Sequence, residues 1–234
     1  MFVRGTTLYL IQGDDIYTTD EGFSFVDDDE FDPAPMTKRA DVDADGSYIY
    51  IATLNSSGFP ILIKFSTALN ADGTVVFEPG GGADIGVECS ETNGDVVWVA
   101  GDFDGNNTVE KTENAGTSFV VKDPGTFQPV TAFKVGPVTD EIVLVATESS
   151  GSIGLVSIEE TRNDGTAWSE KNAGLSAPAR VRAIDRLDIN DAEIVLGNST
   201  AATHRVDYSP NTGDDLDDLT SGSPAFNVTV VIVP

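Results

Sequence analysis

A short pattern recurs along this chain: a hydroxyl residue, then Asp or Asn, then Gly, at alternate positions, with an aromatic residue at the end. It occurs as TTDEGFSF from Thr18, KTENAGTSF from Lys111 and TRNDGTAW from Thr161, and a looser copy, SPNTGDDL, begins at Ser209. The glycines of these copies are separated by about 47 residues or by twice that interval. A fixed interval of this length indicates a fold built from repeated units.

Each repeat also contains short apolar runs of β-branched and aromatic residues, which fit buried strands better than helices. These runs are TLYLIQ, YIYIAT, VVWVAG, IVLVAT and EIVLGN. A second strand-like stretch precedes four of the runs, a short edge-like segment follows each pattern, and Gly, Asn, Asp and Pro clusters separate them. No stretch shows convincing helical periodicity, so each unit is expected to consist of four strands.

Four-stranded units at this interval are typical of a β-propeller. We therefore expect an all-β, five-bladed β-propeller with four antiparallel strands per blade, forming a single domain over residues 1–234. The expected blades are residues 1–35 plus 225–234, 36–80, 81–127, 128–176 and 177–224. Because residues 1–6 are too few to supply an inner strand, the C-terminal strand Phe226–Val233 is expected to join blade one and close the ring.

The recurring pattern resembles the Asp-box of the sialidase-like (BNR) β-propellers, S/T-x-D/N-x-G-x-T/S-W/F. The resemblance implies a hairpin turn between the third and fourth strands of a blade, on the rim and away from a central site. In such a turn the Asp or Asn bonds the turn backbone, and Gly takes an angle that a side chain would forbid. The structural residues of the boxes are then Asp20, Gly22, Asn114, Gly116, Asn163, Gly165, Asn211 and Gly213.

The charge balance restricts the partners of this chain. It has 39 acidic against 13 basic residues and a net charge of −26. Nucleic-acid phosphates and anionic membrane surfaces would be repelled, so we expect no nucleic-acid partner and no membrane insertion. We also expect no signal peptide and no transmembrane span, because the sequence does not open with a basic stretch and an apolar run, and no run of about 18 apolar residues occurs. An Asp-rich surface of this kind favours a high-salt environment, and a mesophilic protein with an acidic surface is the alternative.

Basic residues are too few for a sialidase-like active site, which needs an arginine cluster. Arg180, Arg182 and Arg186 fall on or beside one expected inner strand, and Arg39 falls on another. They are the candidates for binding an anionic partner. The alternative is that they are solvated strand ends or pair with nearby Asp residues.

A second enzymatic possibility is a glycan-active hydrolase that uses carboxylates around the central tunnel. Asp41, Asp43, Glu88 and Asp185 lie on or near the expected inner strands. In a chain with 39 acidic residues, some carboxylates reach such positions by chance. The short loops also leave little material for a deep sugar pocket.

The stretch DVDADG, which places Asp41, Asp43 and Asp45 before a glycine, has the ligand spacing of calcium loops. An EF-hand would need Glu at the twelfth position, where Ala52 stands, so an acidic hairpin turn is the alternative. No other cofactor is expected. The single Cys89 is interpreted as a small buried apolar residue, and the lone histidine cannot form a zinc triad with it.

These features together predict a non-catalytic structural or binding propeller. Similar propellers occur in phage and archaeal-virus particles, so the prediction is a turret, spike or tail-associated protein on the virion surface of a halophilic virus. It would mediate assembly, as a homo-oligomer beside other virion subunits, or attachment to a host-surface glycan or protein. An extracellular or cytoplasmic location is the alternative, and the alternative functions are the glycan hydrolase and a cellular assembly factor.

Overall fold

The structure, a computed structural model, describes the backbone of residues 2–4, 7–12, 15–19, 26–30, 39–68, 73–123, 130–148, 156–171, 180–186, 194–199, 204–209 and 217–218. Side chains are described over 40–68, 73–82, 84–123, 130–147 and 158–171, and at 184. Every regular element in these ranges is a β-strand, and none of them contains a helix that could cross a membrane. The chain separates into two compact units, Met1–Val121 and Lys122–Pro234.

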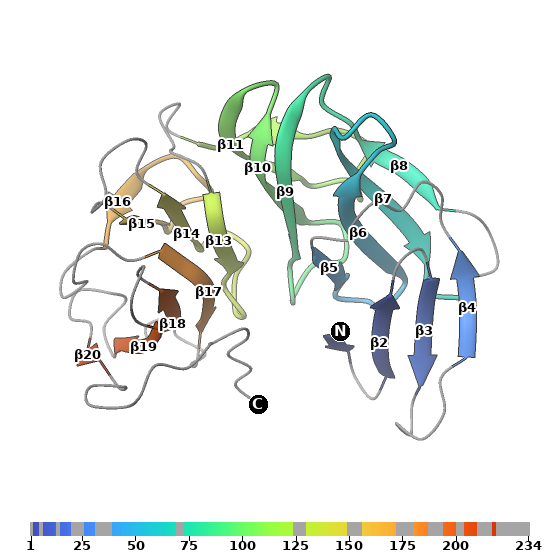
Figure 1. The fold of residues 1–234 in the computed structure, drawn as a ribbon, viewed down its shortest axis with the longest axis horizontal. Coiled ribbons are helices and arrows are strands. Elements are labelled where there is room, and N and C mark those ends of the chain that lie inside the picture. Colours follow the sequence, from blue (N-terminus) through green and yellow to red (C-terminus); the bar gives the residue numbers. More distant parts are fainter. Residues whose placement is uncertain are drawn as a thin grey trace. The chain divides into compact units, whose positions relative to one another are not determined.

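The first unit holds three four-stranded antiparallel sheets, and each sheet follows chain order from strand to strand (Figure 1). The first sheet contains β1 (Phe2–Arg4), β2 (Thr7–Gln12), β3 (Asp15–Thr19) and β4 (Val26–Glu30). The second contains β5 (Arg39–Val42), β6 (Tyr48–Leu54), β7 (Pro60–Ser66) and β8 (Thr74–Phe77). The third contains β9 (Gly82–Cys89), β10 (Val97–Phe103), β11 (Asn106–Thr112) and β12 (Val120–Val121).

The second unit holds two more sheets of the same kind. One contains β13 (Val130–Val135), β14 (Val143–Glu148), β15 (Val156–Thr161) and β16 (Trp168–Glu170). The other contains β17 (Arg180–Arg186), β18 (Ile194–Ser199), β19 (His204–Ser209) and β20 (Asp217–Asp218). The predicted repeat of four consecutive antiparallel strands is therefore confirmed.

The first sheet corrects one expectation. Residues 1–6 do supply a strand, because β1 pairs antiparallel with β2, with Phe2 opposite Tyr9 and Arg4 opposite Thr7. The strand is short, which is why its sequence alone did not identify it. The expected closing strand, Phe226–Val233, lies outside the described residues.

In the second and third sheets, whose side chains are described, the second strand is the most buried. All five residues from 49 to 53 in β6 are buried, as are those from 97 to 101 in β10. Their unbroken apolar runs match strands that are covered on both faces. The outer strands differ: Val75 in β8 and both residues of β12 are about half exposed. Burial thus falls from the second strand toward the outer edge.

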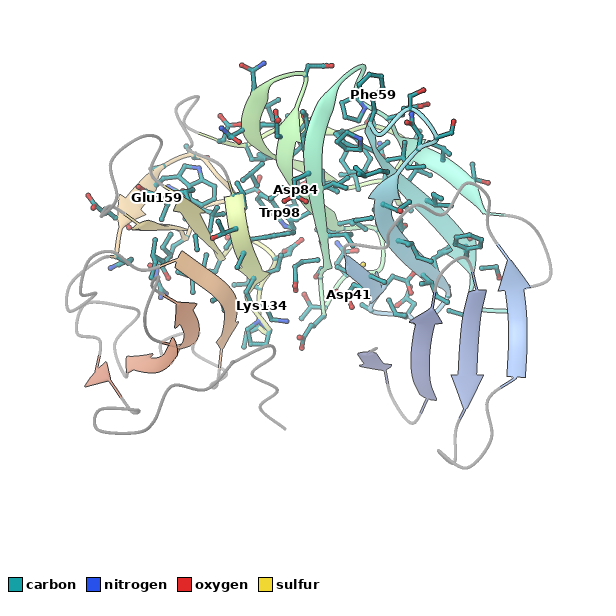
Figure 2. The ribbon with its side chains drawn as sticks, in the orientation of Figure 1. Asp41, Phe59, Asp84, Trp98, Lys134 and Glu159 are labelled. Carbon is teal, nitrogen blue, oxygen red and sulfur yellow. The ribbon has the colours of Figure 1, made fainter. Side chains whose placement is uncertain are left out.

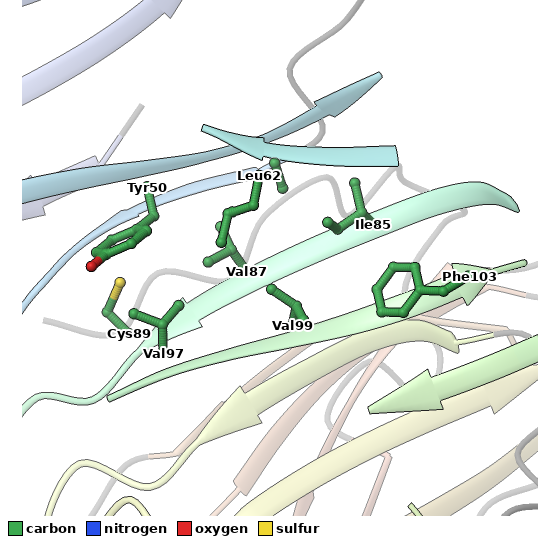
Figure 3. Packing of buried hydrophobic residues seen from close by; sticks show 9 residues of the cluster. Tyr50, Leu62, Ile85, Val87, Cys89, Val97, Val99 and Phe103 are labelled. Atoms are coloured by element: carbon green, nitrogen blue, oxygen red, sulfur yellow. The ribbon is translucent and has the colours of Figure 1, made fainter. Parts of the chain in front are cut away.

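The largest described cluster of buried side chains joins the second and third sheets (Figure 3). Tyr50 and Leu62 from the second sheet face Val87, Val99 and other apolar residues of the third (Figure 3). Each such side chain contributes about 1.5–3 kcal/mol when fully buried. Cys89 belongs to this cluster and is 3% exposed, so its interpretation as a small buried residue is confirmed.

Candidate binding site

The turn between β11 and β12 is held by its own side chains. The Thr112 hydroxyl donates to Asn114 Oδ1 at 2.8 Å and accepts from the Gly116 amide at 3.1 Å. Asn114 Oδ1 also accepts from the Ser118 amide at 2.9 Å. Gly116 has φ of +89°, in the region where a side chain is strained. The threonine hydroxyl and the asparagine amide of the pattern therefore make hydrogen bonds within this turn, and the glycine allows its positive φ.

The turn between β15 and β16 repeats the same contacts. The Thr161 hydroxyl donates to Asn163 Oδ1 at 3.0 Å and accepts from the Gly165 amide at 2.9 Å. Asn163 Oδ1 accepts from the Ala167 amide at 2.9 Å, and Gly165 has φ of +75°. Both turns join the third and fourth strands of their sheets, as the sequence pattern predicts.

The first turn is also fastened to the second sheet. Lys64 on β7 donates from Nζ to the carbonyl oxygen of Ala115 at 3.0 Å. The Phe119 ring, which ends the pattern, lies with its centroid 4.8 Å from that of Phe77 on β8. A lysine and an aromatic contact therefore connect the turn to the sheet that precedes it in the chain.

The second turn has an equivalent lysine. Lys122 forms an ion pair with Asp164, which occupies the position of Ala115 in the pattern. The Trp168 indole nitrogen donates to the carbonyl oxygen of Lys122 at 2.8 Å. In both turns, then, a lysine from an earlier segment holds the residue before the glycine, and the aromatic residue packs or bonds beside it.

A pocket of about 400 Å³ opens where the first turn meets the second sheet. We call it the Lys64 pocket. Its lining comes from β6, β7, β8 and the turn, and consists of Tyr48, Lys64, Ser66, Thr74, Val76, Ala115, Gly116 and Thr117. It therefore combines one cation, three aliphatic hydroxyls, one aromatic ring and a small apolar wall.

The Lys64 ammonium is fixed in place at one side of this pocket. Its Nζ lies 3.7 Å from the centroid of the Tyr48 ring, a distance typical of a cation–π contact. Burial lowers the pKa of Lys64, and the charges of Asp43 and Asp95 oppose that shift by favouring the protonated amine. The local charge of the lysine is thus partly balanced by these two carboxylates.

Deeper in the second sheet, the Tyr50 hydroxyl is buried with no hydrogen-bond partner among the described residues. Tyr50 itself is 0% exposed. Burial is the main cause that raises the pKa of this hydroxyl, and Cys89 and Asp43 raise it further. Tyr50 therefore stays neutral at ordinary pH and is not suited to act as a general base.

The three aspartates of the expected calcium loop do not converge. Asp43 Oδ1 accepts from the Ser47 and Tyr48 amides at 2.7 and 3.2 Å, which closes the β5–β6 turn. Asp41 on β5 (Figure 2) accepts from the Cys89 amide at 2.8 Å, and Asp45 is exposed. Within the described side chains no group of acidic, His or Cys residues could hold a metal. The Asp41 and Asp43 carboxylates thus bond backbone amides, as in the acidic hairpin turn that was the alternative, and calcium binding by this stretch stays a prediction.

The candidate arginines lie on strands whose side chains are only partly described. Arg39 begins β5, opposite Ala52, and Arg180 and Arg186 delimit β17. A register shift in β17 falls at Arg182, between its two neighbours. The side chains of these four arginines, and that of Asp185, are outside the described set, so their role as a binding cluster stays a prediction. Glu88 lies on β9 opposite Trp98.

The other box residues also fall beyond the described part of the chain. They are Asp20, Gly22, Asn211 and Gly213. The lone His204 begins β19, and only its backbone is described.

Sequence reasoning did not find the two lysines that hold the turns. Lys64 stands in β7 as the only charged residue of PILIKFS, within a run that is otherwise mostly buried. A lysine in such a strand was the available signal, since lysine is seldom buried unless it is paired. Its partner, Ala115, lies 51 residues away, so its acceptor could not be read from local sequence.

No protein-family model and no curated protein sequence matches this chain. Solved structures do match. A protein assigned as TolB in Agrobacterium tumefaciens aligns with a TM-score of 0.69 and 12% identity over 92% of this chain and 76% of its own. A nidogen/laminin complex gives a TM-score of 0.63 and 15% identity, with coverage of 89% and 76%. An ancestral GH74 enzyme gives 0.56 and 14%, with coverage of 77% and 23%.

These neighbours are β-propellers, and together with the repeated four-stranded sheets they show that the chain has a β-propeller fold. At 12–15% identity the likeness concerns the fold alone. Because one propeller fold carries many unrelated functions, the activity must be argued from the residues of this chain.

Proposed function

We propose that this chain is a non-catalytic β-propeller that binds and displays a partner. The observation that carries this proposal is how five buried or half-buried charged side chains are used. Asp41 and Asp43 accept hydrogen bonds from backbone amides, Lys64 and Lys122 hold the two turns, and Glu160 pairs with a neighbouring arginine. A catalytic acid or base needs to reach a substrate proton, whereas these groups stabilise sheets and turns.

We also propose that each of the five sheets is one blade of the propeller, and that the recurring turns are Asp-boxes. The support is that all five sheets have four consecutive antiparallel strands. The two described turns have the hydroxyl, amide and glycine contacts that the Asp-box pattern implies. Turns fastened by lysine and aromatic contacts would make such a ring a rigid support for binding surfaces.

The proposed setting is the virion surface of a halophilic virus, where the propeller acts in assembly or in attachment to a host glycan. The support is the net charge of −26, which molar salt would screen within about 3 Å. A rigid, acidic domain suits repeated display in brine, because its surface carboxylates stay hydrated and limit unspecific association.

Fractionation of the native source tests this setting. The chain is expected to sediment with particles in a density gradient and to stay with them through a wash in molar salt. An antibody against the chain would locate it in each fraction, and a known cytoplasmic protein serves as the control. Recovery of the chain as free monomer, together with that cytoplasmic control, would contradict the virion assignment.

A further inference from the structure

We infer that the Lys64 pocket binds one neutral monosaccharide unit of a glycan. This inference rests on the proposed function as a binding propeller and names the site and the chemistry of its ligand. The arginines of β5 and β17, which were the earlier binding candidates, play no part in it.

The size of the pocket fits a ligand of this class. Its volume of about 400 Å³ lies at the lower end of the range of roughly 300–1,000 Å³ for small-molecule sites. Two of its walls come from different sheets of the first unit, since Tyr48, Lys64 and Thr74 belong to the second sheet and Thr117 to the turn of the third. A ligand would therefore contact both sheets at once.

The polar groups of the pocket suit hydroxyls. A lysine ammonium carries three hydrogen-bond donors, and the bond to the Ala115 carbonyl oxygen uses one of them. The hydroxyls of Ser66 and Thr74 can both donate and accept. A sugar hydroxyl also does both, so each group in the pocket has a matching function on the ligand.

The apolar part of the pocket suits the C–H surface of a sugar ring. Tyr48, the first residue of β6, is 38% exposed, so part of its ring is accessible to a ligand. Val76 supplies an aliphatic wall next to the turn glycine. A ligand with hydroxyls on its rim and C–H groups on its faces can use both kinds of contact.

Charge excludes the two other ligand classes that a lysine pocket suggests. A cation would meet the Lys64 ammonium directly. An anion would have to approach a chain of net charge −26, and the carboxylates of Asp43 and Asp95 already interact with the lysine charge. A neutral polyhydroxylated ligand meets neither the repulsion from Lys64 nor the repulsion from the net negative charge.

The geometry also holds the lysine ready for binding. Contacts with the Ala115 carbonyl oxygen and the Tyr48 ring fix the ammonium before any ligand arrives. A flexible lysine would lose rotamer freedom on binding, and this one has already lost it on folding. The lysine ammonium is thus preorganised, so that little conformational entropy is lost when a ligand binds.

Isothermal titration calorimetry on the full chain tests the inference, with methyl glycosides of glucose, galactose and mannose as probes. We expect at least one to bind with a dissociation constant on the order of 1 mM. Lys64→Met and Thr74→Ala are each expected to weaken binding at least tenfold. Lys122→Met is the matched control, because it removes the equivalent lysine of the other turn without touching the pocket. N-acetylneuraminic acid and glucosamine serve as charged comparators.

Equal binding by Thr74→Ala and the unmodified chain would overturn the pocket assignment and leave glycan binding elsewhere on the propeller intact. An equal loss of affinity in Lys64→Met and Lys122→Met would also overturn the pocket assignment, because the loss would then reflect a general effect on folding. Tighter binding of either charged sugar would overturn the neutral ligand class. If no monosaccharide binds, the pocket assignment fails, and binding of larger glycans to the unmodified chain then decides the proposed function separately.

Discussion

Replacing Gly165 with alanine is expected to lower the free energy of unfolding by about 3 kcal/mol. The residue has φ of +75°, where a non-glycine residue costs about 1–2 kcal/mol. A Cβ atom placed there would also lie 2.5 Å from the carbonyl oxygen of Lys122. That oxygen accepts the Trp168 indole bond, so it cannot move away without loss, and overpacking of this kind adds about 1–3 kcal/mol.

Substitutions at two other glycines distinguish the effect of backbone strain from that of the steric clash. Gly46 has a similar φ of +68° with nothing within 4 Å of an added Cβ, so Gly46→Ala is expected to cost only about 1 kcal/mol. The loss expected for Gly116→Ala is intermediate between those two losses. Its added Cβ would meet the Val76 side chain at 3.0 Å, and a side chain can move away more easily than backbone. Urea unfolding followed by tryptophan fluorescence measures all three. Equal losses at Gly165 and Gly46 would show that the turn is not packed against Lys122.

Replacing Lys111 with glutamate is expected to cost about 3–5 kcal/mol, because it places an unmatched buried carboxylate beside Glu113. The Lys111 side chain is 3% exposed, and its Nζ lies 3.0 Å from Glu113 Oε1. The other described turn has the same pair with reversed charges: Glu160, 1% exposed, lies 2.9 Å from Arg162. Both pairs occupy the positions before and after the threonine of the recurring pattern.

The reversed pair supplies the matched test. The double variant Lys111→Glu/Glu113→Arg reproduces the polarity found at Glu160 and Arg162, and it should recover about half of the stability lost by the single variant. Urea unfolding of the two single variants and the double variant gives the coupling energy, which we expect to be about 2 kcal/mol. A double variant whose loss equals the sum of the single losses would mean that the two sites use their charges independently.

The strands and turns could be predicted from sequence because their causes are local. Runs such as YIYIAT have the composition of covered strands, and they became β6 and its equivalents. The spacing of Thr112, Asn114 and Gly116 specifies a turn whose Thr112 and Asn114 side chains make their hydrogen bonds within a few residues. The strand β1 was missed because three residues give too little pattern to identify.

The candidate site could not be predicted because its contacts join distant segments. Lys64 finds its acceptor 51 residues away, and the Lys64 pocket exists only where a turn meets a different sheet. The acidic stretch from Asp41 left two interpretations open, a calcium loop and an acidic hairpin turn. Its spacing is compatible with an ion, and local sequence could not show that the Ser47 and Cys89 amides donate to the Asp43 and Asp41 carboxylates.

The central claim is that this propeller binds a glycan without changing it. Its most direct test is to incubate the purified chain with a set of labelled neutral oligosaccharides in molar salt, and to analyse the bound and free fractions by mass spectrometry. We predict that some oligosaccharides are retained by the chain and recovered at their original mass. Shortened products that accumulate with time, and that disappear when Asp41 is replaced by asparagine, would contradict the claim.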